Sequence, residues 1–230
     1  MAQAHDNGSP DTLPRALIDA LQGAFLVFDG PDGSGKSTQH KRFGNAVASA
    51  GLELCEVREP GGTHVGERIR EALLEHSDEE MSVRCEMMLY MASRAQLVEQ
   101  RILPALGRGA CVLADRFVSS TLAYQGTAGG LPMQQIHVVA AIACGGIRPD
   151  LVVIFDLDEH TAASRLSPLL DRMEAKGEAF HARVRGGYLA QAKADPERYV
   201  VIDASKEPDE VFESLVSTLA QRLPARKASK

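Results

Sequence analysis

Eight consecutive residues near the N-terminus, Gly30 to Ser37, have the composition of a phosphate-binding loop. They read G-P-D-G-S-G-K-S and fit the pattern G-x-x-x-x-G-K-[ST]. An apolar run precedes them and a helix-like stretch follows, so backbone N–H groups and the positive end of a helix would face a polyphosphate. In such a loop the lysine, Lys36, meets the β- and γ-phosphates, and the Ser37 hydroxyl meets Mg²⁺.

This loop predicts binding of a nucleoside triphosphate, with an ordinary glycine turn as the alternative. The residues predicted to bind ATP are Gly30, Asp32, Gly33, Ser34, Gly35, Lys36, Ser37 and Thr38.

A second polar turn, Arg58-Glu59-Pro60-Gly61-Gly62-Thr63, follows another strand-like run. Pro60 stops strand pairing, and the two glycines let the backbone turn close to a ligand. An arginine at the end of a strand can hold a phosphate, whereas a solvated arginine on a tight turn is the structural alternative.

A third polar segment starts with Asp115 and Arg116 at the end of the run Val112 to Ala114. This carboxylate and guanidinium could serve Mg²⁺ and phosphate respectively, or could form a structural ion pair. The following residues, 120–126, place hydroxyls, an aromatic ring and an amide in one stretch, which suits a base and sugar pocket.

Two further groups lie on helix-like segments. Tyr90 and Arg94 are four residues apart and share a helical face, so they could stack on a nucleobase and bond its carbonyl edge. A partly buried tyrosine beside a surface arginine is the alternative. The run Leu170 to Glu174 opens a later helix after Arg165, and a basic segment there could close over ATP, or simply begin a helix. The histidines lack the spacing of metal ligands and are given no role.

The elements that position these groups alternate between strand-like and helix-like runs, as in a parallel α/β sheet. Several strands end in an acidic residue or an arginine, and open α/β sheets bind ligands at that edge. The predicted strands are 25–29, 52–57, 111–115, 151–156 and 199–203. The predicted helices are 36–50, 65–75, 79–106, 133–143, 171–194 and 209–223, and the stripe of Met81, Cys85, Met88, Ala92 and Ala95 is expected to be core.

We expect one α/β domain over residues 23–224, with a five-stranded parallel sheet flanked by helices. Residues 1–22 are predicted to be a partly disordered leader, although 13–21 form a short apolar segment, and residues 225–230 a flexible tail. The 230 residues suffice for one α/β domain with a full core.

Charge and composition exclude several classes of partner. The net charge of −6 gives no basic field for a nucleic-acid polymer. The N-terminus has no signal-peptide apolar region, and no apolar run approaches the ~20 residues of a membrane span. Four scattered cysteines without C-x-x-C pairs, three of them in apolar runs, favour a reducing compartment and argue against a zinc site. We expect a cytoplasmic protein.

Taken in order, these motifs resemble thymidylate kinases. The resemblance rests on the phosphate loop with Asp32, on Arg-Glu-Pro-Gly-Gly-Thr at 58–63, on Asp-Arg-Phe-x-x-Ser-x-x-Ala-Tyr-Gln-Gly at 115–126 and on Leu-Asp-Arg-Met-Glu at 170–174. It runs from about Phe25 to Leu223, and the second and third blocks are more specific than the phosphate loop. It implies a P-loop nucleoside monophosphate kinase fold with a short lid at about 160–171. It also implies transfer of the γ-phosphoryl group of ATP to dTMP, Mg²⁺ as cofactor and a homodimer.

The resemblance also implies a role for each matching residue. Tyr90 would stack on thymine and Arg94 would bond a thymine carbonyl, while Thr121 would reach the base edge and Tyr124 would lie against the deoxyribose. The residues that it assigns to the acceptor are Asp32, Arg58, Tyr90, Arg94, Arg116, Thr121, Tyr124 and Gln125. The catalytic set is Lys36, Arg116, Asp32, Arg165 and Arg172, and the metal set is Ser37, Asp115 and Glu174.

The lid departs from the family pattern. Where the phosphate loop has glycine at the position of Gly33, thymidylate kinases usually carry a run of arginines in the lid, but residues 161–170 contain only Arg165 and include Pro168. The candidates for the arginine that contacts the transferring group are Arg165 and Arg172, and we assign it to Arg165.

Two rival functions use the same motifs. A kinase of another pyrimidine nucleoside or nucleotide would keep the ATP site and change the acceptor pocket. A non-catalytic nucleotide-binding module would use the triphosphate as a switch, but it would not need the arginines on the acceptor side. A structural protein with a vestigial loop fits least, because Lys36 and Ser37 are intact.

Overall fold

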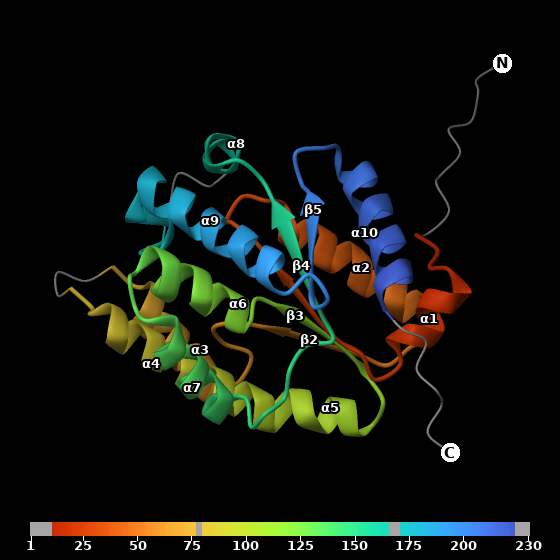
Figure 1. Cartoon of the computed structure of the whole chain (residues 1–230). Coiled ribbons are helices and arrows are strands. Elements are labelled where there is room, and N and C mark those ends of the chain that lie inside the picture. The colour runs from red at the N-terminus through yellow and green to blue at the C-terminus, as the bar shows by residue number, and fades with distance from the viewer. Residues whose placement is uncertain (1–10, 77–79, 166–170, 224–230) are drawn as a thin grey trace.

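The computed structural model describes residues 11–76, 80–165 and 171–223, and five strands at its centre form one sheet (Figure 1). The strand order is β2-β3-β1-β4-β5, and every neighbouring pair is parallel. The strands are β1 (Phe25–Asp29), β2 (Leu54–Arg58), β3 (Cys111–Asp115), β4 (Leu151–Asp156) and β5 (Tyr199–Asp203). The predicted five-stranded parallel sheet is confirmed, and Arg58 is the last residue of its strand.

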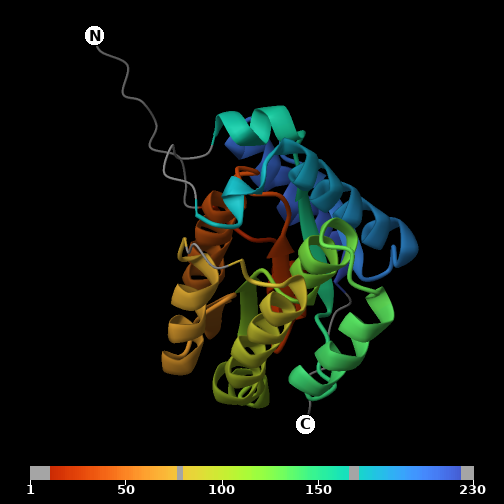
Figure 2. The same ribbon diagram turned by 90° about the vertical axis from the view of Figure 1, so that its left-hand side faces the viewer.

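Helices connect the strands and cover both faces of the sheet (Figure 2). The α-helices are α1 (Arg15–Leu21), α2 (Lys36–Ser49), α3 (His64–Leu74), α4 (Val83–Leu97), α5 (Leu103–Gly107), α6 (Val118–Thr121), α7 (Met133–Ala143), α8 (Glu159–Ser164), α9 (Glu178–Ala194) and α10 (Pro208–Arg222). Two π-helical segments, η1 (Val98–Ile102) and η2 (Leu122–Ala128), and one 3₁₀ turn, η3 (Glu174–Lys176), complete them. No helix in the described ranges is long and apolar enough to cross a membrane.

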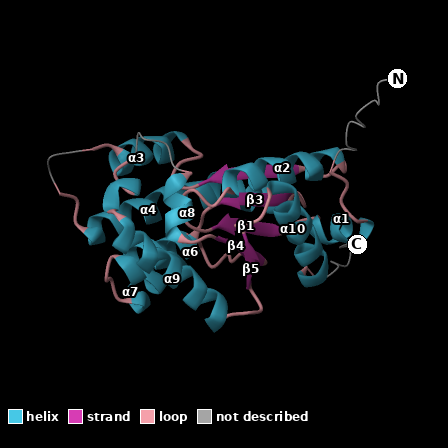
Figure 3. Ribbon diagram, turned by 90° about the horizontal axis from the view of Figure 1, so that it is seen from above, coloured by secondary structure: helices cyan, strands magenta, loops and turns pink. Residues whose placement is uncertain are grey.

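Helices lie on both sides of the sheet (Figure 3). An apolar layer on each face holds them to it. Alternate residues of a strand point to opposite faces, so Leu26 and Phe28 of β1 pack toward α1, α2 and α10, while Phe25 and Val27 pack toward α4 and α9. All four of these side chains are at most 1% exposed. A strand that is buried on both faces reads as a continuous apolar run, which is why the strands were visible in the sequence.

The strand register brings the ends of neighbouring strands to one edge. Asp115 is paired with Phe28 of β1 and with Arg58 of β2, and Asp29 is paired with Ile154 of β4. The polar turns that follow β1, β2 and β3 therefore meet at the carboxyl edge of the sheet. Helix α8 lies beyond the same edge (Figure 2).

Helix α1 belongs to the segment that we assigned to the leader. Its side chains Leu17 and Leu21 are wholly buried in the layer shared with α2 and α10. The described part of that segment is therefore packed from Leu13 onward. Residues 1–10 and 224–230 lie outside the described residues, so the predictions of a disordered leader and a flexible tail stay predictions.

The long helix predicted from residue 79 has different limits and a different inner face. It begins at Val83, where the Ser82 hydroxyl accepts from the Cys85 N–H, and it continues through η1 into α5. The predicted core stripe is wrong, since Cys85, Met88 and Ala92 are exposed and Met81 and Ala95 are only half-buried. The inner face carries Glu86, Met87, Met91, Ser93 and Arg94. Apolar periodicity could not find this face because paired charged groups occupy part of it.

Two other expectations differ from the structure. The helix predicted for 171–194 is a 3₁₀ turn followed by α9, because Gly177, with φ +83°, interrupts it. Of the three cysteines in apolar runs, Cys111 and Cys144 are buried, whereas Cys55 on the edge strand β2 is only half-buried. None of the four cysteines forms a disulfide.

Candidate active site

The phosphate-binding loop joins β1 to α2 and packs against the backbone of α8. Gly33 has φ +79°, and a Cβ atom built on it would lie 2.3 Å from the Ala162 carbonyl oxygen. Only glycine fits both the left-handed backbone and this close approach. Gly33 is thus also the packing contact between the phosphate loop and α8.

Polar groups inside this loop are suited to bind an anion. Ser34 is 3% exposed, and its Oγ has no hydrogen-bond partner among the described residues. Buried polar atoms without partners are rare in folded proteins, and a phosphate oxygen would satisfy this one. Lys36 is 7% exposed, at the first position of α2. The loop fits the triphosphate predicted for it.

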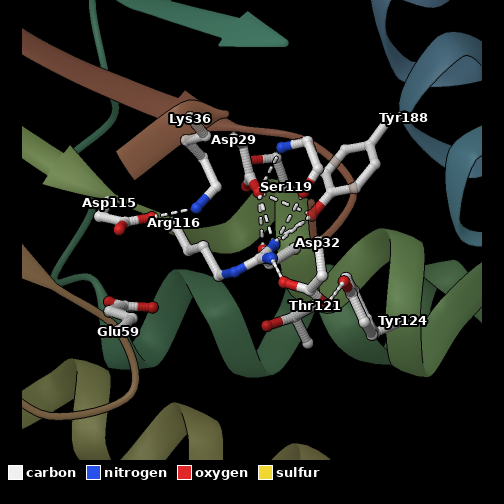
Figure 4. Close-up of polar contacts among 12 residues, drawn as sticks. Asp29, Asp32, Lys36, Glu59, Asp115, Arg116, Ser119, Thr121, Tyr124 and Tyr188 are labelled. Atoms are coloured by element: carbon white, nitrogen blue, oxygen red, sulfur yellow. Dashed lines mark hydrogen bonds and ion pairs between the residues drawn. The ribbon is translucent and has the colours of Figure 1, made fainter. Parts of the chain in front are cut away.

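Lys36 connects the phosphate loop to the end of β3. Its Nζ donates to Asp115 Oδ1 at 2.6 Å (Figure 4). Burial alone would raise the pKa of the Asp115 carboxyl, but Lys36 and then Arg116 outweigh burial and hold this pKa below its ordinary value of 3.8. Asp115 therefore stays ionised as a partner for a cation.

Arg116 is the centre of the polar network. It is the only non-glycine residue with positive φ in the described chain, at φ +70°, a conformation that persists only where surrounding contacts enforce it. Its Nη1 donates to Tyr188 at 2.9 Å, to Ser120 at 3.0 Å and to the Gly30 carbonyl at 3.1 Å. Its Nη2 pairs with Asp32. These contacts hold the guanidinium beside the phosphate loop (Figure 4).

Asp29, at the end of β1, anchors Arg116 and was not predicted. It is fully buried, lies 3.2 Å from Arg116 Nη1, and accepts hydrogen bonds from the hydroxyls of Ser119, Ser120 and Tyr188 at 2.6–2.8 Å. The only signal in the sequence was an acidic residue at the end of a strand. Its partners come from α6 and α9, which no local pattern could indicate.

Asp32 and Tyr124 lie beside Arg116. Tyr124 donates its hydroxyl hydrogen to Asp32 Oδ2 at 2.7 Å. Burial raises the pKa of Asp32, but Arg116 and the Tyr124 hydroxyl outweigh it and keep the pKa below 3.8. For Tyr124, burial dominates and raises the pKa well above its ordinary value. At neutral pH the site thus holds an ionised carboxylate and a neutral phenol.

One cavity joins the phosphate loop to the polar turns after β2 and β3 and to residues 171–174. Its lining includes most of the acceptor and metal residues predicted from the sequence: Asp32, Lys36, Ser37, Arg58, Tyr90, Asp115, Arg116, Thr121, Tyr124, Gln125 and Glu174. It also includes residues that were not predicted: Glu59, Pro60, Arg70, Leu74, Ser120, Asp171 and Met173. The predicted residues Arg94, Arg165 and Arg172 are not in this lining.

Arg94 lies beneath the cavity. It is 1% exposed, and its guanidinium forms a buried ion pair with Glu59 at 2.5 Å and donates to Thr121 Oγ1 at 3.1 Å. Burial raises the pKa of Glu59, although Arg94 opposes this. The structure therefore brings Arg94 to Thr121, which lines the cavity. Direct contact between Arg94 and a base stays a prediction.

Arg58 and Arg70 both line the cavity. Arg58 is half exposed and donates to Glu67 at 2.8 Å, and Glu67 also accepts from the Gly62 N–H at 2.7 Å. Arg70 on α3 donates to the Pro60 carbonyl at 3.0 Å, and burial, together with Arg58, lowers its pKa. Arg70 was missed because it belongs to none of the motifs that the sequence singled out.

Residues 171–174 form another wall of the cavity. Arg172 Nε donates to the Leu73 carbonyl at 2.7 Å, and its Nη2 lies 2.7 Å from Glu86 Oε2 as an ion pair. Glu174, predicted as a metal ligand, accepts from the Asp171 N–H at 3.0 Å. Arg172 is therefore turned toward α3 and α4, which does not favour a catalytic role.

Arg165 follows α8. Its guanidinium donates to the Ala204 carbonyl at 3.3 Å, just after β5. The rest of the predicted lid, residues 166–170, lies outside the described residues. Arg165 would have to leave Ala204 to reach a transferring phosphoryl group, so its catalytic role stays a prediction.

The fold and the cavity define a P-loop phosphotransferase. A parallel sheet carries a phosphate loop at its carboxyl edge, and arginines and aromatic side chains face the same cavity as the loop lysine. A protein that only binds a triphosphate as a switch would not need the additional arginines Arg58, Arg70 and Arg116 in the same cavity.

Comparison with known proteins identifies the family. A family model described as thymidylate kinase matches residues 28–215. The thymidylate kinase of Pseudomonas savastanoi pv. phaseolicola is 44% identical over 209 residues, which are 90% of this chain and 100% of that protein. The thymidylate kinase of an Exiguobacterium species is 45% identical over 207 residues, with 87% and 98% covered. The crystal structure of the Ehrlichia chaffeensis thymidylate kinase superposes with a TM-score of 0.69 at 27% identity, covering 86% and 98%.

The chain belongs to the thymidylate kinase family. It is an enzyme that uses ATP to phosphorylate dTMP to dTDP, a step in nucleotide synthesis. The resemblance seen in the sequence is confirmed, and the rival kinase and binding-module functions are not supported.

Proposed function

We propose that the two reacting phosphates meet in the cavity between the phosphate loop and α4, with ATP on the loop side and dTMP on the α4 side. The observation that carries this proposal is that Lys36 and Ser37 line the same cavity as Arg116, Tyr90 and Gln125. Phosphoryl transfer needs positioning and charge neutralisation more than covalent chemistry, and these side chains supply both.

On the ATP side, backbone N–H groups of the phosphate loop and the Lys36 side chain hold the phosphates. Lys36 exchanges its contact with Asp115 for the β- and γ-phosphates. Mg²⁺ fits here, because Ser37 and Asp115 offer a hydroxyl and a carboxylate within one cavity, and Mg²⁺ takes one or two protein ligands besides phosphates and water. When bound, Mg²⁺ would neutralise charge on the phosphates. Glu174 is a further candidate, because it lines the same cavity.

On the dTMP side, Arg116, Arg58 and Arg70 bind the acceptor phosphate. Guanidinium groups suit this role because they form charge-assisted, bidentate hydrogen bonds with phosphate. The strained and fully partnered Arg116 has the most fixed position of the three. We assign Arg70 to this set because it lines the cavity beside Arg58.

The nucleoside lies against the α4 and η2 residues of the cavity. Tyr90 stacks on the thymine ring, while Thr121 and Gln125 meet the base edge. The Thr121 hydroxyl already accepts from Arg94, so its own hydrogen is available to a base carbonyl. Tyr124 packs on the deoxyribose, and Asp32 accepts the 3′-hydroxyl or a water on Mg²⁺.

The reaction is an in-line displacement. An oxygen of the dTMP phosphate bonds to the γ-phosphorus as the bond to the β–γ bridging oxygen breaks, giving dTDP and ADP. The attacking oxygen is already anionic near pH 7, so the site needs no strong general base. Lys36 and Arg116 offset the charge that spreads over the transferring group. Arg165 joins them when it leaves the Ala204 carbonyl.

We further propose that the enzyme is a homodimer. The exposed large apolar side chains Met88 on α4 and Met133, Val138 and Ile142 on α7 belong to two helices that pack against each other. Their exposures range from 39% to 77%, and such a patch marks an interaction surface.

We also propose that the enzyme works in the cytoplasm. None of its four cysteines forms a disulfide, which fits a reducing compartment.

Because dTMP binds on the α4 side of the cavity and ATP on the loop side, Tyr90→Leu should raise the KM for dTMP and leave the KM for ATP nearly unchanged. This change removes the ring and keeps apolar volume, so the KM for dTMP should rise about tenfold, the cost of one lost base stack. The KM for ATP should stay within about twofold. Steady-state kinetics with each substrate varied in turn measures both values. An equal rise in both KM values, or a rise for ATP alone, would contradict the assignment.

A further inference from the structure

A buried carboxylate lies next to the base-binding side of the cavity. Glu86 on α4 is 1% exposed, and three side chains from two other segments converge on it. Gln125 Nε2 donates to Glu86 Oε1 at 2.7 Å, Arg172 Nη2 lies 2.7 Å from Oε2, and Lys176 Nζ lies 3.2 Å from Oε2. Neither the phosphate chemistry nor the sequence motifs use this group.

Glu86 fixes which end of the Gln125 amide faces it. An ionised carboxylate only accepts hydrogen bonds, so the amide nitrogen must point toward Glu86 and the amide oxygen must point elsewhere. Gln125 is 1% exposed but lines the cavity. Its Oε1 forms no hydrogen bond with any residue in the described ranges. The oxygen is therefore the atom left for a ligand.

The two cations hold the carboxylate in place. Arg172 also donates to the Leu73 carbonyl, and Lys176 lies over the Phe180 ring, 4.9 Å from its centroid. Both come from the 171–176 segment, which forms a wall of the cavity. Arg172 lies on Oε2, Gln125 donates to Oε1, and Lys176 lies 3.2 Å from Oε2 and 3.4 Å from Oε1. Both carboxylate oxygens therefore have partners that hold their orientation.

We infer that Glu86 is a positioning residue for base selection, because it makes Gln125 present an acceptor to the base. Thymine carries a hydrogen at N3 and can donate to Oε1, whereas cytosine has a lone pair at N3 and cannot. A site that leaves buried polar groups unpaired rejects the wrong ligand strongly. This inference rests on the proposed contact between Gln125 and the base.

The test compares kcat/KM for dTMP with kcat/KM for dCMP in four proteins: wild type, Glu86→Gln, Gln125→Ala and the double variant. In Glu86→Gln the new amide can offer either end to Gln125, so the dTMP/dCMP ratio should fall by about tenfold or more. Gln125→Ala should lower the ratio similarly. In the double variant the Glu86 change should have no further effect, since it acts through Gln125.

Lys176→Met is the matched control, because it removes a second contact of the same carboxylate and leaves the Gln125 contact intact. It should keep the dTMP/dCMP ratio within about threefold of wild type. If Glu86→Gln does not fold, Glu86→Asp, which keeps the charge but shortens the side chain by one methylene, carries the same test.

Several results would overturn the inference. They are an unchanged ratio in the Glu86 variant while Gln125→Ala lowers it, an equal loss for both nucleotides, or additive effects in the double variant. These leave the proposed function intact. An unchanged ratio in Gln125→Ala would instead reject the base contact itself, and the inference with it.

Discussion

At the scale of single residues, the site is held by opposite charges at the carboxyl edge of the sheet. Lys36 pairs with Asp115, and Arg116 pairs with Asp29 and Asp32. The ion pair with Asp115 keeps the Lys36 side chain extended toward the cavity before any ligand binds. A phosphate that binds Lys36 competes with Asp115 for it. The ion pairs thus keep the cations of the site in position for an anionic ligand.

These pairs predict how stability depends on pH. Burial raises the pKa of Asp115, but Lys36 and Arg116 together outweigh it, so the folded-state pKa lies below its ordinary value of 3.8. Its contribution is therefore fully present above about pH 5 and is lost as the pH falls through the folded-state pKa. The free energy of unfolding of wild type should decline from pH 6 to pH 3 more steeply than that of Asp115→Asn. Denaturant titrations at several pH values measure this, and identical slopes would contradict it.

The residues that sequence analysis found and missed differ in one respect. Lys36, Arg116 and Tyr124 lie in sequence motifs where neighbours along the chain define the chemistry. Asp29 and Glu86 act through partners more than 30 residues away, as in the contact of Glu86 with Gln125. Spacing along one segment could not reveal them.

At the scale of elements, the phosphate loop and α8 fit together only with glycine at position 33. Gly33→Ala and Gly51→Ala both place a side chain at φ near +80°, but a Cβ at Gly51 meets nothing within 4 Å. We expect Gly51→Ala to cost about 1 kcal/mol of unfolding free energy. Gly33→Ala should cost at least about 1 kcal/mol more, because it also meets the Ala162 carbonyl. Urea unfolding measures both, and equal costs would show that α8 does not rest on the loop.

The sequence predicted where the strands and helices lie better than it predicted which side of a helix is buried. The central strands β1, β3 and β4 were found because strands that are buried on both faces are continuously apolar. The edge strands β2 and β5 are partly exposed, and their short apolar runs were enough to find them. The inner face of α4 was predicted wrongly, because Glu86 and Arg94 are buried by pairing with charges on other elements. Hydrophobic patterning counts such residues as exposed, so it cannot orient a helix that carries part of a site.

At the scale of the whole molecule, the apolar patch on α4 and α7 predicts a dimer. The double variant Val138→Asp, Ile142→Asp places charges on side chains that are 57% and 77% exposed, and it should convert the dimer to monomer at micromolar concentration. Val201→Asp changes another exposed apolar side chain, on the edge strand β5, and should leave the dimer intact. Analytical ultracentrifugation distinguishes the states. A wild-type mass equal to the 24.7 kDa chain would contradict the proposal.

An assay of ADP release with Mg·ATP and each of dTMP, dUMP, dCMP, UMP and AMP tests most directly whether the cavity takes dTMP as acceptor. Lys36→Ala serves as a control for contaminating kinases, and it should lower kcat by about 10²- to 10³-fold. We predict strong turnover that depends on dTMP and is lost in this variant. Turnover with another nucleotide and little with dTMP would contradict the acceptor pocket described above.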